Sequence, residues 1–144
     1  MLLTGIFSRS IDEKLRVAIP KRLREALESG KQPIYIAPGT DQSLAIYAEE
    51  ALTRLAERLA QASPTRQDVR TFNRLFYARA QRVELDAQGR VRVPGELAEF
   101  AHFEKEVVLL GVQDHVEVWS ARRWKSYLVE KGGQYDEIAE TAFR

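Results

Sequence analysis

The sequence predicts an α+β protein built from two copies of one supersecondary unit, with helices between and after them. The chain of 144 residues repeats a β-rich pattern at a fixed offset, and helical patterns follow each copy. Its composition, 44% hydrophobic and 30% charged, is typical of a globular protein with room for one core. Two copies of one unit usually stack because neither buries its apolar face alone. We therefore expect the copies to share a core.

The repeat is clearest in two segments of ten residues. Residues 11–20, IDEKLRVAIP, align with residues 85–94, LDAQGRVRVP, and Asp, Arg, Val and Pro recur in place. Further along, Leu23 aligns with Leu97. After a two-residue deletion, residues 44–47 align with residues 116–119. This divides the chain into a first unit at 5–51, a helical linker at 52–79, a second unit at 80–123 and a C-terminal helix and tail at 124–144.

Each copy predicts the order strand, strand, helix, strand, strand. The second strand of each copy stops at a proline, which cannot donate to a β ladder but suits the start of a helix. In copy one the helix places Leu23, Ala26 and Leu27 on one stripe and ends at Gly30, a residue suited to a left-handed cap. The predicted ranges are strands 16–19, 34–36 and 44–47 around helix 20–29, and strands 90–93, 107–110 and 116–119 around a helix with Leu97, Phe100 and Ala101.

Two amphipathic helices are predicted between the copies. Leu52, Leu55 and Leu59 mark the first over about 48–62, and Val69, Phe72 and Phe76 mark the second after a break at 63–65. A helix with Trp124, Tyr127 and Leu128 follows copy two. The tail 134–144 is acidic and weakly patterned, so we expect it to be mobile or to dock on another subunit.

The charge is segregated along the chain. The net charge of +1 divides into +3 over residues 1–27, −2 over 28–63, +4 over 64–94 and −4 over 95–144. Basic segments that converge on one face would attract an anionic polymer. The alternative is a solvated surface on which charges cluster by chance.

Several classes of function are disfavoured. Without cysteine there is no disulfide, thiolate metal site or cysteine nucleophile, and His102 and His115 are too few for a histidine metal centre. We expect no cofactor, no small-molecule substrate and no enzyme activity. The longest apolar run, 107–112, is too short for a membrane span, and no secretory pattern opens the chain. A cytoplasmic protein without a membrane partner is the default expectation.

The repeated Asp-x-x-x-Arg motif is the main candidate site. Asp12 and Asp86 stand where an aspartate at the start of a turn accepts backbone N–H groups, and Gly89 suits a turn position with positive φ. Arg16 and Arg90 leave these turns with planar guanidinium groups suited to phosphate or to the acceptor edge of guanine. The alternative is an ion pair that closes each turn and does nothing further.

Other basic and aromatic residues have less specific interpretations. Arg66, Arg70 and Arg74 recur at i+4 on one predicted helix and could face phosphates, but a solvated or subunit-facing helix side is favoured. Trp119 and Trp124 with Tyr127 could stack on bases, although packing in the core or an interface is favoured.

The paired motifs resemble those of the MraZ family of bacterial transcriptional regulators in the AbrB-like superfamily. The resemblance covers roughly residues 3–128 and includes 12–16 with Ile19-Pro20, 85–90 with Val93-Pro94, 74–78, 104–112, 116–119 and Trp124. It implies two tandem AbrB-like units, also called SpoVT-AbrB units, that form an intramolecular swapped-hairpin β-barrel core with flanking helices.

The resemblance also implies a function and its residues. Family members form ring-shaped homo-oligomers, here an octamer or a similar ring, associate with the nucleoid, and bind double-stranded DNA at promoter repeats of the division and cell-wall gene cluster. Lys14, Arg16 and Arg90 occupy the positions that contact DNA in the family. One departure is Leu15, where the family has glycine. A leucine there would strain a turn that needs positive φ, or force another turn type.

Two hypotheses of different classes follow. The first is a sequence-specific DNA-binding regulator that binds direct repeats as an oligomer. The alternative is an antitoxin-like protein-interaction module with weak or no specific DNA binding. A hydrolase that uses Asp12 and Asp86 is disfavoured, because an arginine four residues on lowers the pKa of each carboxyl, whereas a general acid needs it raised.

Overall fold

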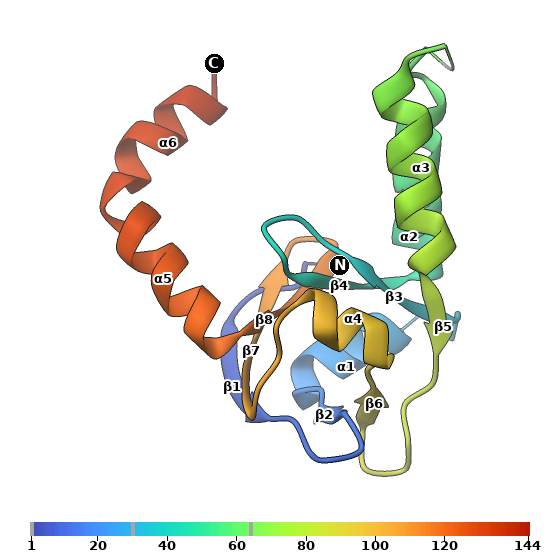
Figure 1. Cartoon of the computed structure of the whole chain (residues 1–144), viewed down its shortest axis with the longest axis vertical. Coiled ribbons are helices and arrows are strands. Elements are labelled where there is room, and N and C mark those ends of the chain that lie inside the picture. Colours follow the sequence, from blue (N-terminus) through green and yellow to red (C-terminus); the bar gives the residue numbers. More distant parts are fainter. Residues whose placement is uncertain (1, 30, 64) are drawn as a thin grey trace.

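The computed structural model describes residues 2–29, 31–63 and 65–144 and shows a β body from which two helical projections rise on one side (Figure 1). One projection is the α2–α3 hairpin and the other is the α5–α6 arm. The elements, in chain order, are β1 (Ile6–Ser10), β2 (Arg16–Ala18), α1 (Lys21–Glu28), β3 (Ile34–Pro38), β4 (Leu44–Ala48), α2 (Glu49–Ala60), α3 (Gln67–Arg79), β5 (Gln81–Val83), β6 (Arg90–Arg92), α4 (Gly95–Phe100), β7 (Glu106–Val112), β8 (His115–Ser120), α5 (Ala121–Lys131), the short 3₁₀ turn η1 (Gly132–Gln134) and α6 (Tyr135–Ala142).

The two copies interleave their strands. The larger sheet has the order β1-β7-β8-β4-β3-β5, and β2 pairs with β6 in a separate two-stranded ribbon. The first strand of each copy therefore pairs with the third strand of the other, β1 with β7 and β5 with β3. Val17 pairs with its own equivalent, Val91, and Ala45 pairs with its own equivalent, Glu117. These self-equivalent pairs confirm the repeat and relate the two copies by an approximate twofold axis.

The expected closed barrel is not found among the described residues. β1 pairs only with β7 and β5 only with β3, so these two strands remain the outer strands of the sheet. The local reason is that each copy leaves the large sheet at its Asp-x-x-x-Arg turn. The next strand, β2 or β6, then enters the separate ribbon instead of continuing the sheet. The mixed α and β architecture with two tandem units is confirmed.

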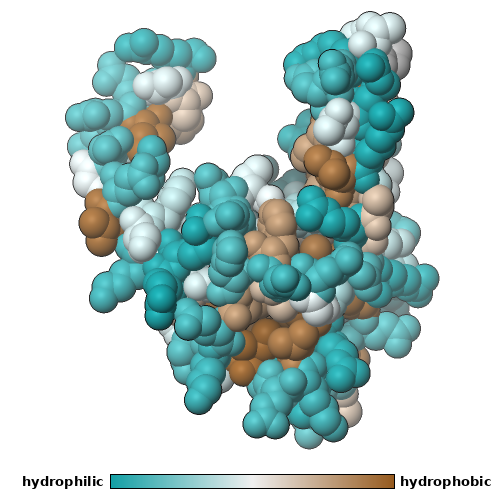
Figure 2. Space-filling model, viewed as in Figure 1, coloured by the Kyte–Doolittle hydropathy of each residue, from teal (hydrophilic) through white to brown (hydrophobic). Residues whose placement is uncertain are grey.

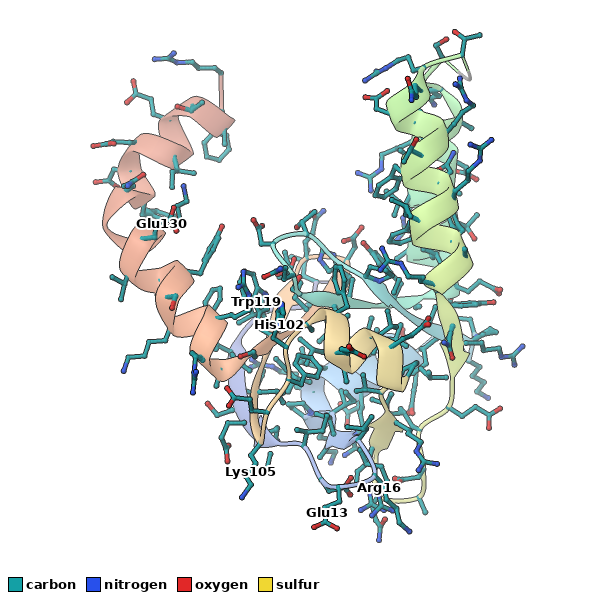
Figure 3. The ribbon with its side chains drawn as sticks, viewed as in Figure 1. Glu13, Arg16, His102, Lys105, Trp119 and Glu130 are labelled. Carbon is teal, nitrogen blue, oxygen red and sulfur yellow. The ribbon has the colours of Figure 1, made fainter. Side chains whose placement is uncertain are left out.

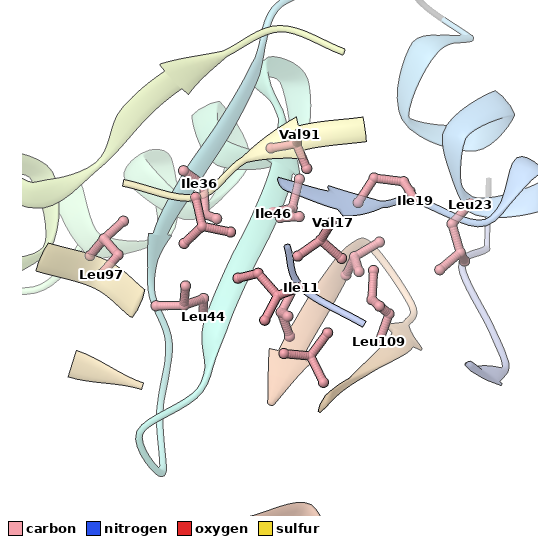
Figure 4. Close-up of a cluster of buried hydrophobic side chains, with 14 of the residues drawn as sticks. Ile11, Val17, Ile19, Leu23, Ile36, Leu44, Ile46, Val91, Leu97 and Leu109 are labelled. Carbon is pink, nitrogen blue, oxygen red and sulfur yellow. The ribbon is translucent and has the colours of Figure 1, made fainter. Parts of the chain in front are cut away.

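One apolar core lies between the sheet, the ribbon and the short helices α1 and α4 (Figure 4). Equivalent residues of the two copies enter it together, because Val17, Val91, Leu23 and Leu97 are all at most 1% exposed. Burying a side chain of this size stabilises the fold by about 1.5 to 3 kcal/mol. Because both copies line the same core, neither copy has a complete core by itself. Other fully buried members are Ile36, Leu44, Ile46, Leu109, Val116 and Val118.

The predicted helices are confirmed. α1 follows Pro20 and α4 follows Pro94, and each proline is the residue just before the first helical residue. Gly30, the predicted helix cap, lies outside the described residues. The hairpin of α2 and α3 also forms as predicted, and Leu52 and Phe76 anchor its base against Ala37 of β3.

The C-terminal tail, residues 134–144, is more regular than the sequence analysis predicted. It forms α6, in which Tyr135, Ile138, Ala139 and Ala142 follow the i, i+3, i+4, i+7 spacing of an apolar helix face. The acidic residues between them hid this stripe. Figure 2 shows apolar side chains on both projections and also across the middle of the β body, with hydrophilic ones around them.

The tryptophans pack against one another as predicted. The Trp119 ring lies 5.2 Å from the Trp124 ring and 5.0 Å from the Tyr127 ring, centroid to centroid. Trp119 is buried beneath α5 together with Val108 and Leu110. This cluster fixes the root of the arm on β7 and β8. No helix within the described residues is long and apolar enough to cross a membrane.

Candidate nucleic-acid interface

The two Asp-x-x-x-Arg turns have the same internal hydrogen bonds. Asp12 Oδ1 accepts the backbone N–H of Lys14 at 2.9 Å and that of Arg16 at 2.8 Å. Asp86 Oδ1 accepts the backbone N–H of Gln88 and that of Arg90, both at 2.9 Å. Each aspartate therefore shapes its turn as the sequence predicted.

Each arginine is also held by the aspartate of its own turn. Arg16 Nε donates to Asp12 Oδ2 at 2.7 Å, and Arg90 Nε donates to Asp86 Oδ2 at 2.8 Å. The ion pair that closes the turn is therefore present in both copies. It leaves the arginine side chains 33% and 28% exposed, so neither is folded into the core. In Figure 3 Arg16 and Glu13 lie at the end of the body opposite the two projections.

The terminal guanidinium nitrogens differ between the copies. Arg90 Nη2 donates to the side-chain oxygen of Gln88. Arg16 uses only Nε, and within the described residues its two terminal nitrogens contact no acceptor. Since the Nε contact fixes the plane of the group, the terminal nitrogens of Arg16 are oriented donors at the protein surface.

Hydrogen bonds lower the pKa of both aspartates. The largest cause is the backbone N–H of Arg16 for Asp12 and of Arg90 for Asp86, and the arginine side chains add to it while desolvation opposes it. Both carboxyls are therefore ionised at neutral pH. An acid held ionised cannot donate a proton, which argues against a general-acid role for these residues.

Backbone hydrogen bonds tie the two turns together. Val93 N–H donates to Leu15 O at 2.8 Å, and Ile19 N–H donates to Gly89 O at 3.0 Å. Arg92 Nε donates to Lys14 O at 3.1 Å. The predicted residues Lys14, Arg16 and Arg90 therefore belong to one connected surface, and Lys14 is exposed on it.

Leu15 adopts the same turn conformation as glycine. Its φ is +62°, and that of its equivalent, Gly89, is +75°. The first of the two predicted outcomes, a strained turn of unchanged type, is therefore the one observed. Holding leucine in this left-handed region costs about 1 to 2 kcal/mol. The half-buried Leu15 side chain packs on the core, which offsets part of this cost.

Arg92 was not among the residues predicted to contact DNA. It stands opposite Arg16 in the ribbon, and Ala18 stands opposite Arg90. Because Val17 and Val91 point into the core, these four flanking residues lie on the other face of the ribbon. The alternation of residues 90–93, RVRV, was the signal that could have identified Arg92.

The helical arginines lie elsewhere. Arg66, Arg70 and Arg74 belong to the hairpin projection, which rises from the opposite end of the body from β2 and β6 (Figure 1). Arg66 pairs with Asp68 at 2.6 Å. Among the described residues no group of three or more His, Cys, Asp or Glu residues could hold a metal ion.

Comparison with known proteins identifies the family. A family model of MraZ proteins, whose description adds "antitoxin-like", matches residues 2–75 and 76–144, one match for each copy. Relatives named Transcriptional regulator MraZ from Moorella thermoacetica and Heliobacterium modesticaldum are each 40% identical over 136 residues, which is 94% of this chain and 93% of each relative. One of that name from Lactiplantibacillus plantarum is 38% identical over 136 residues, 94% of each chain. The chain belongs to the MraZ family.

Proposed function

We propose that this protein is a transcriptional regulator that binds direct repeats in promoter DNA through the outer face of the β2–β6 ribbon and its two turns. The observation that carries the proposal is the pair of aspartate-anchored turns, which hold Arg16 and Arg90 on one exposed surface with Lys14 and Arg92. The relatives' name, Transcriptional regulator MraZ, supports the regulatory role.

The chemistry of these residues suits a DNA groove. A guanidinium group can donate two parallel hydrogen bonds to the O6 and N7 atoms of guanine, and Lys14 can neutralise a phosphate. An arginine already oriented by Asp12 or Asp86 loses less side-chain entropy on binding than a free one. An antiparallel two-stranded ribbon is also narrow enough to enter the major groove.

The proposal includes an assembly of several copies. One ribbon offers few base contacts. In a ring of subunits, an octamer or a similar closed oligomer, several ribbons would bind the same DNA, which would raise the overall affinity by about 10² to 10⁴. Subunits spaced around a ring would select direct repeats about one helical turn, or 10 base pairs, apart. The target we propose is the promoter of the division and cell-wall gene cluster, bound by a cytoplasmic, nucleoid-associated protein. The reciprocal strand pairing supports a swapped-hairpin relation of the two units.

A mobility-shift series on promoter DNA tests the binding surface. We expect Arg16→Ala and Arg90→Ala to weaken binding at least tenfold. The matched control is Arg54→Ala on α2, which removes an exposed arginine paired with Glu50 on the projection remote from the ribbon. It should leave binding unchanged beyond a small salt-dependent effect. Normal binding by both ribbon variants would refute the assignment of the surface.

The alternative is a protein-interaction module, which the words "antitoxin-like" in the family description favour. Binding to promoter and random DNA at several salt concentrations discriminates between the two. A DNA-binding surface predicts a slope of log affinity against log salt of about −0.9 for each phosphate neutralised. Undetectable binding to both DNAs at every salt concentration would favour the module.

A further inference from the structure

The two turns of the candidate interface, turn one (residues 12–16) and turn two (residues 86–90), hold their arginines differently. Arg90 is held at two points, because its Nε donates to Asp86 Oδ2 and its Nη2 donates to the side-chain oxygen of Gln88. Arg16 is held at one point, where its Nε donates to Asp12 Oδ2. The second contact restrains the Arg90 group beyond what the Nε contact alone does. Arg90 is therefore the more rigidly placed donor of the two.

The backbone of turn two is also covered more closely than that of turn one. Gly89 is buried beneath the side chain of Arg24, whose Nε donates to a backbone carbonyl at 3.0 Å. Leu15, the equivalent residue of turn one, is half-buried and lines two surface cavities of about 660 Å³ and about 320 Å³. Arg92 Nε donates to Lys14 O at 3.1 Å, but Arg92 is exposed. Turn one is therefore the less restrained of the two and can adjust when it binds.

The side chains beside the two arginines differ in charge. Lys14 of turn one is exposed, and turn two has the neutral Gln88 at the equivalent position. Arg16 stands opposite Arg92 in the ribbon, whereas the residue opposite Arg90 is an alanine. The end of the ribbon at turn one therefore carries the larger number of cations on its outer face. Several adjacent cations suit the phosphate backbone, and one rigidly placed guanidinium group suits the edge of a base.

We propose that the two turns have different roles on DNA. Turn two recognises a guanine through Arg90, with Gln88 as the residue that positions the guanidinium group, and turn one anchors the protein on phosphates. The contact with Gln88 leaves hydrogens on both terminal nitrogens of Arg90 for the O6 and N7 atoms of guanine. This inference rests on the proposed function and gives Gln88, which carries no charge, a role in specificity.

The different roles give the ribbon a direction on DNA. A ribbon with perfect twofold symmetry would bind a site equally well in either orientation, as symmetric dimers bind palindromic sites. Unequal turns favour one orientation, with turn two on the guanine. Copies that all bind in one orientation fit direct repeats, which is the arrangement of the proposed target.

Binding of the full chain to promoter DNA and to random DNA of the same length, at several salt concentrations, tests these roles. Gln88→Ala should lower the affinity for promoter DNA about two- to tenfold, because Arg90 loses its second restraint, and should leave the affinity for random DNA unchanged. Lys14→Ala is the matched variant at the equivalent position. It should lower both affinities by the same factor and make the slope of log affinity against log salt less steep by about 0.9.

Gln88→Glu separates positioning of Arg90 from direct contact between residue 88 and a base. Glutamate keeps an acceptor for Arg90 Nη2, so the ratio of promoter affinity to random affinity should stay that of the unmodified protein. The added negative charge should weaken binding to both DNAs alike. A fall of this ratio in Gln88→Glu would overturn the positioning role.

Replacing the guanines of a repeat one at a time with 7-deazaguanine, which lacks the N7 acceptor, identifies the recognised base. One replacement should weaken binding by the unmodified protein and should have no effect on binding by Arg90→Ala. If no position shows this dependence on Arg90, the recognition of guanine is overturned.

The outcomes separate this inference from the proposed function. If Gln88→Ala leaves the promoter affinity unchanged or lowers both affinities alike, or if Lys14→Ala lowers their ratio, the different roles are overturned while DNA binding stands. An unmodified protein that binds neither DNA refutes the proposed function, and the different roles with it. Circular dichroism of every variant confirms that a change in binding is not a loss of folding.

Discussion

Gly89 lies directly beneath the side chain of Arg24, and a Cβ atom on Gly89 would come within 2.7 Å of three atoms of that side chain. Arg24 Nε donates to Ile19 O at 3.0 Å, which holds the guanidinium group over the turn. At the site related to this one by the approximate twofold axis the equivalent residues are Leu15 and Ala98, and both line one pocket. The large and small residues are thus exchanged between the two sites: arginine covers the glycine of the turn at one, and the leucine of the turn is accompanied by alanine at the other.

Gly89→Ala should destabilise the protein by about 1 to 3 kcal/mol. The new methyl group must adopt φ of +75° and must displace Arg24. Urea unfolding measures the loss, and Gly95→Ala is the control, because a Cβ atom there meets nothing within 4 Å. In a protein that already carries Arg24→Ala, Gly89→Ala should lower the free energy of unfolding by less than it does alone, because the side chain that clashes with the new methyl group is gone. Strictly additive effects would contradict the proposed contact.

Leu15 leads to an unusual order of stabilities. At a position with φ of +62°, glycine avoids the steric cost that alanine keeps. Both substitutions lose the packing of the leucine side chain on the core. We therefore expect Leu15→Gly to be more stable than Leu15→Ala by about 1 kcal/mol. Thermal or urea unfolding of the two variants checks the order, and a less stable glycine variant would contradict a strained turn at this position.

Most of the fold could be predicted because the repeat carries the same information twice. The patterns around Pro20 and Pro94 located two short helices, and the shared Asp-x-x-x-Arg spacing located two turns. The pairing of β1 with β7 and of β5 with β3 is a property of long-range contacts, which a local pattern in one strand does not encode. For the same reason the residues 11–20 and 85–94 predicted the turns but not whether the sheet closes.

The candidate site was predicted in its residue types more than in its extent. Asp12, Arg16 and Arg90 form the contacts that the motif suggested. Arg92 was not predicted to contact DNA, and it has no arginine equivalent in the other copy, where Ala18 stands. The apolar face of α6 was missed because acidic residues interrupt it in sequence, although they lie on other sides of the helix.

The lowered pKa values of Asp12 and Asp86 predict a loss of stability in acid. A carboxyl whose pKa is lower in the folded state stabilises the protein above its unfolded pKa, here near the ordinary 3.8, and this contribution is lost as pH falls through the folded pKa. We expect the double variant Asp12→Asn with Asp86→Asn to melt below the unmodified protein at pH 7. The two melting temperatures should converge toward pH 2. A constant difference across this range would show that the turns do not depend on the charge of these residues.

His115 predicts a pH effect of the opposite sign. Its ring lies between Asp114, with Nδ1 2.9 Å from Oδ1, and Glu117, with Nε2 3.1 Å from Oε2. The His115 ring also stacks on the Tyr47 ring, with the two ring centroids 5.1 Å apart. Desolvation lowers the pKa of His115, but the hydrogen bonds and charges of Glu117 and Asp114 outweigh it, and the net shift is above the ordinary 6.5. The imidazolium form is therefore more stable in the folded protein than in the unfolded chain.

The stability that His115 contributes is fully present below pH 6.5 and is lost as pH rises through its folded pKa. His115→Gln should therefore cost more free energy of unfolding at pH 5.5 than at pH 8.5, as measured by urea unfolding at the two pH values. Asp114→Asn is the matched control, because it keeps the histidine and removes one of the two carboxylates. In that variant an NMR titration of His115 should give a lower pKa than in the unmodified protein. If His115→Gln costs the same at both pH values, the imidazole is held neutral by its buried environment, and the two carboxylates do not govern its charge.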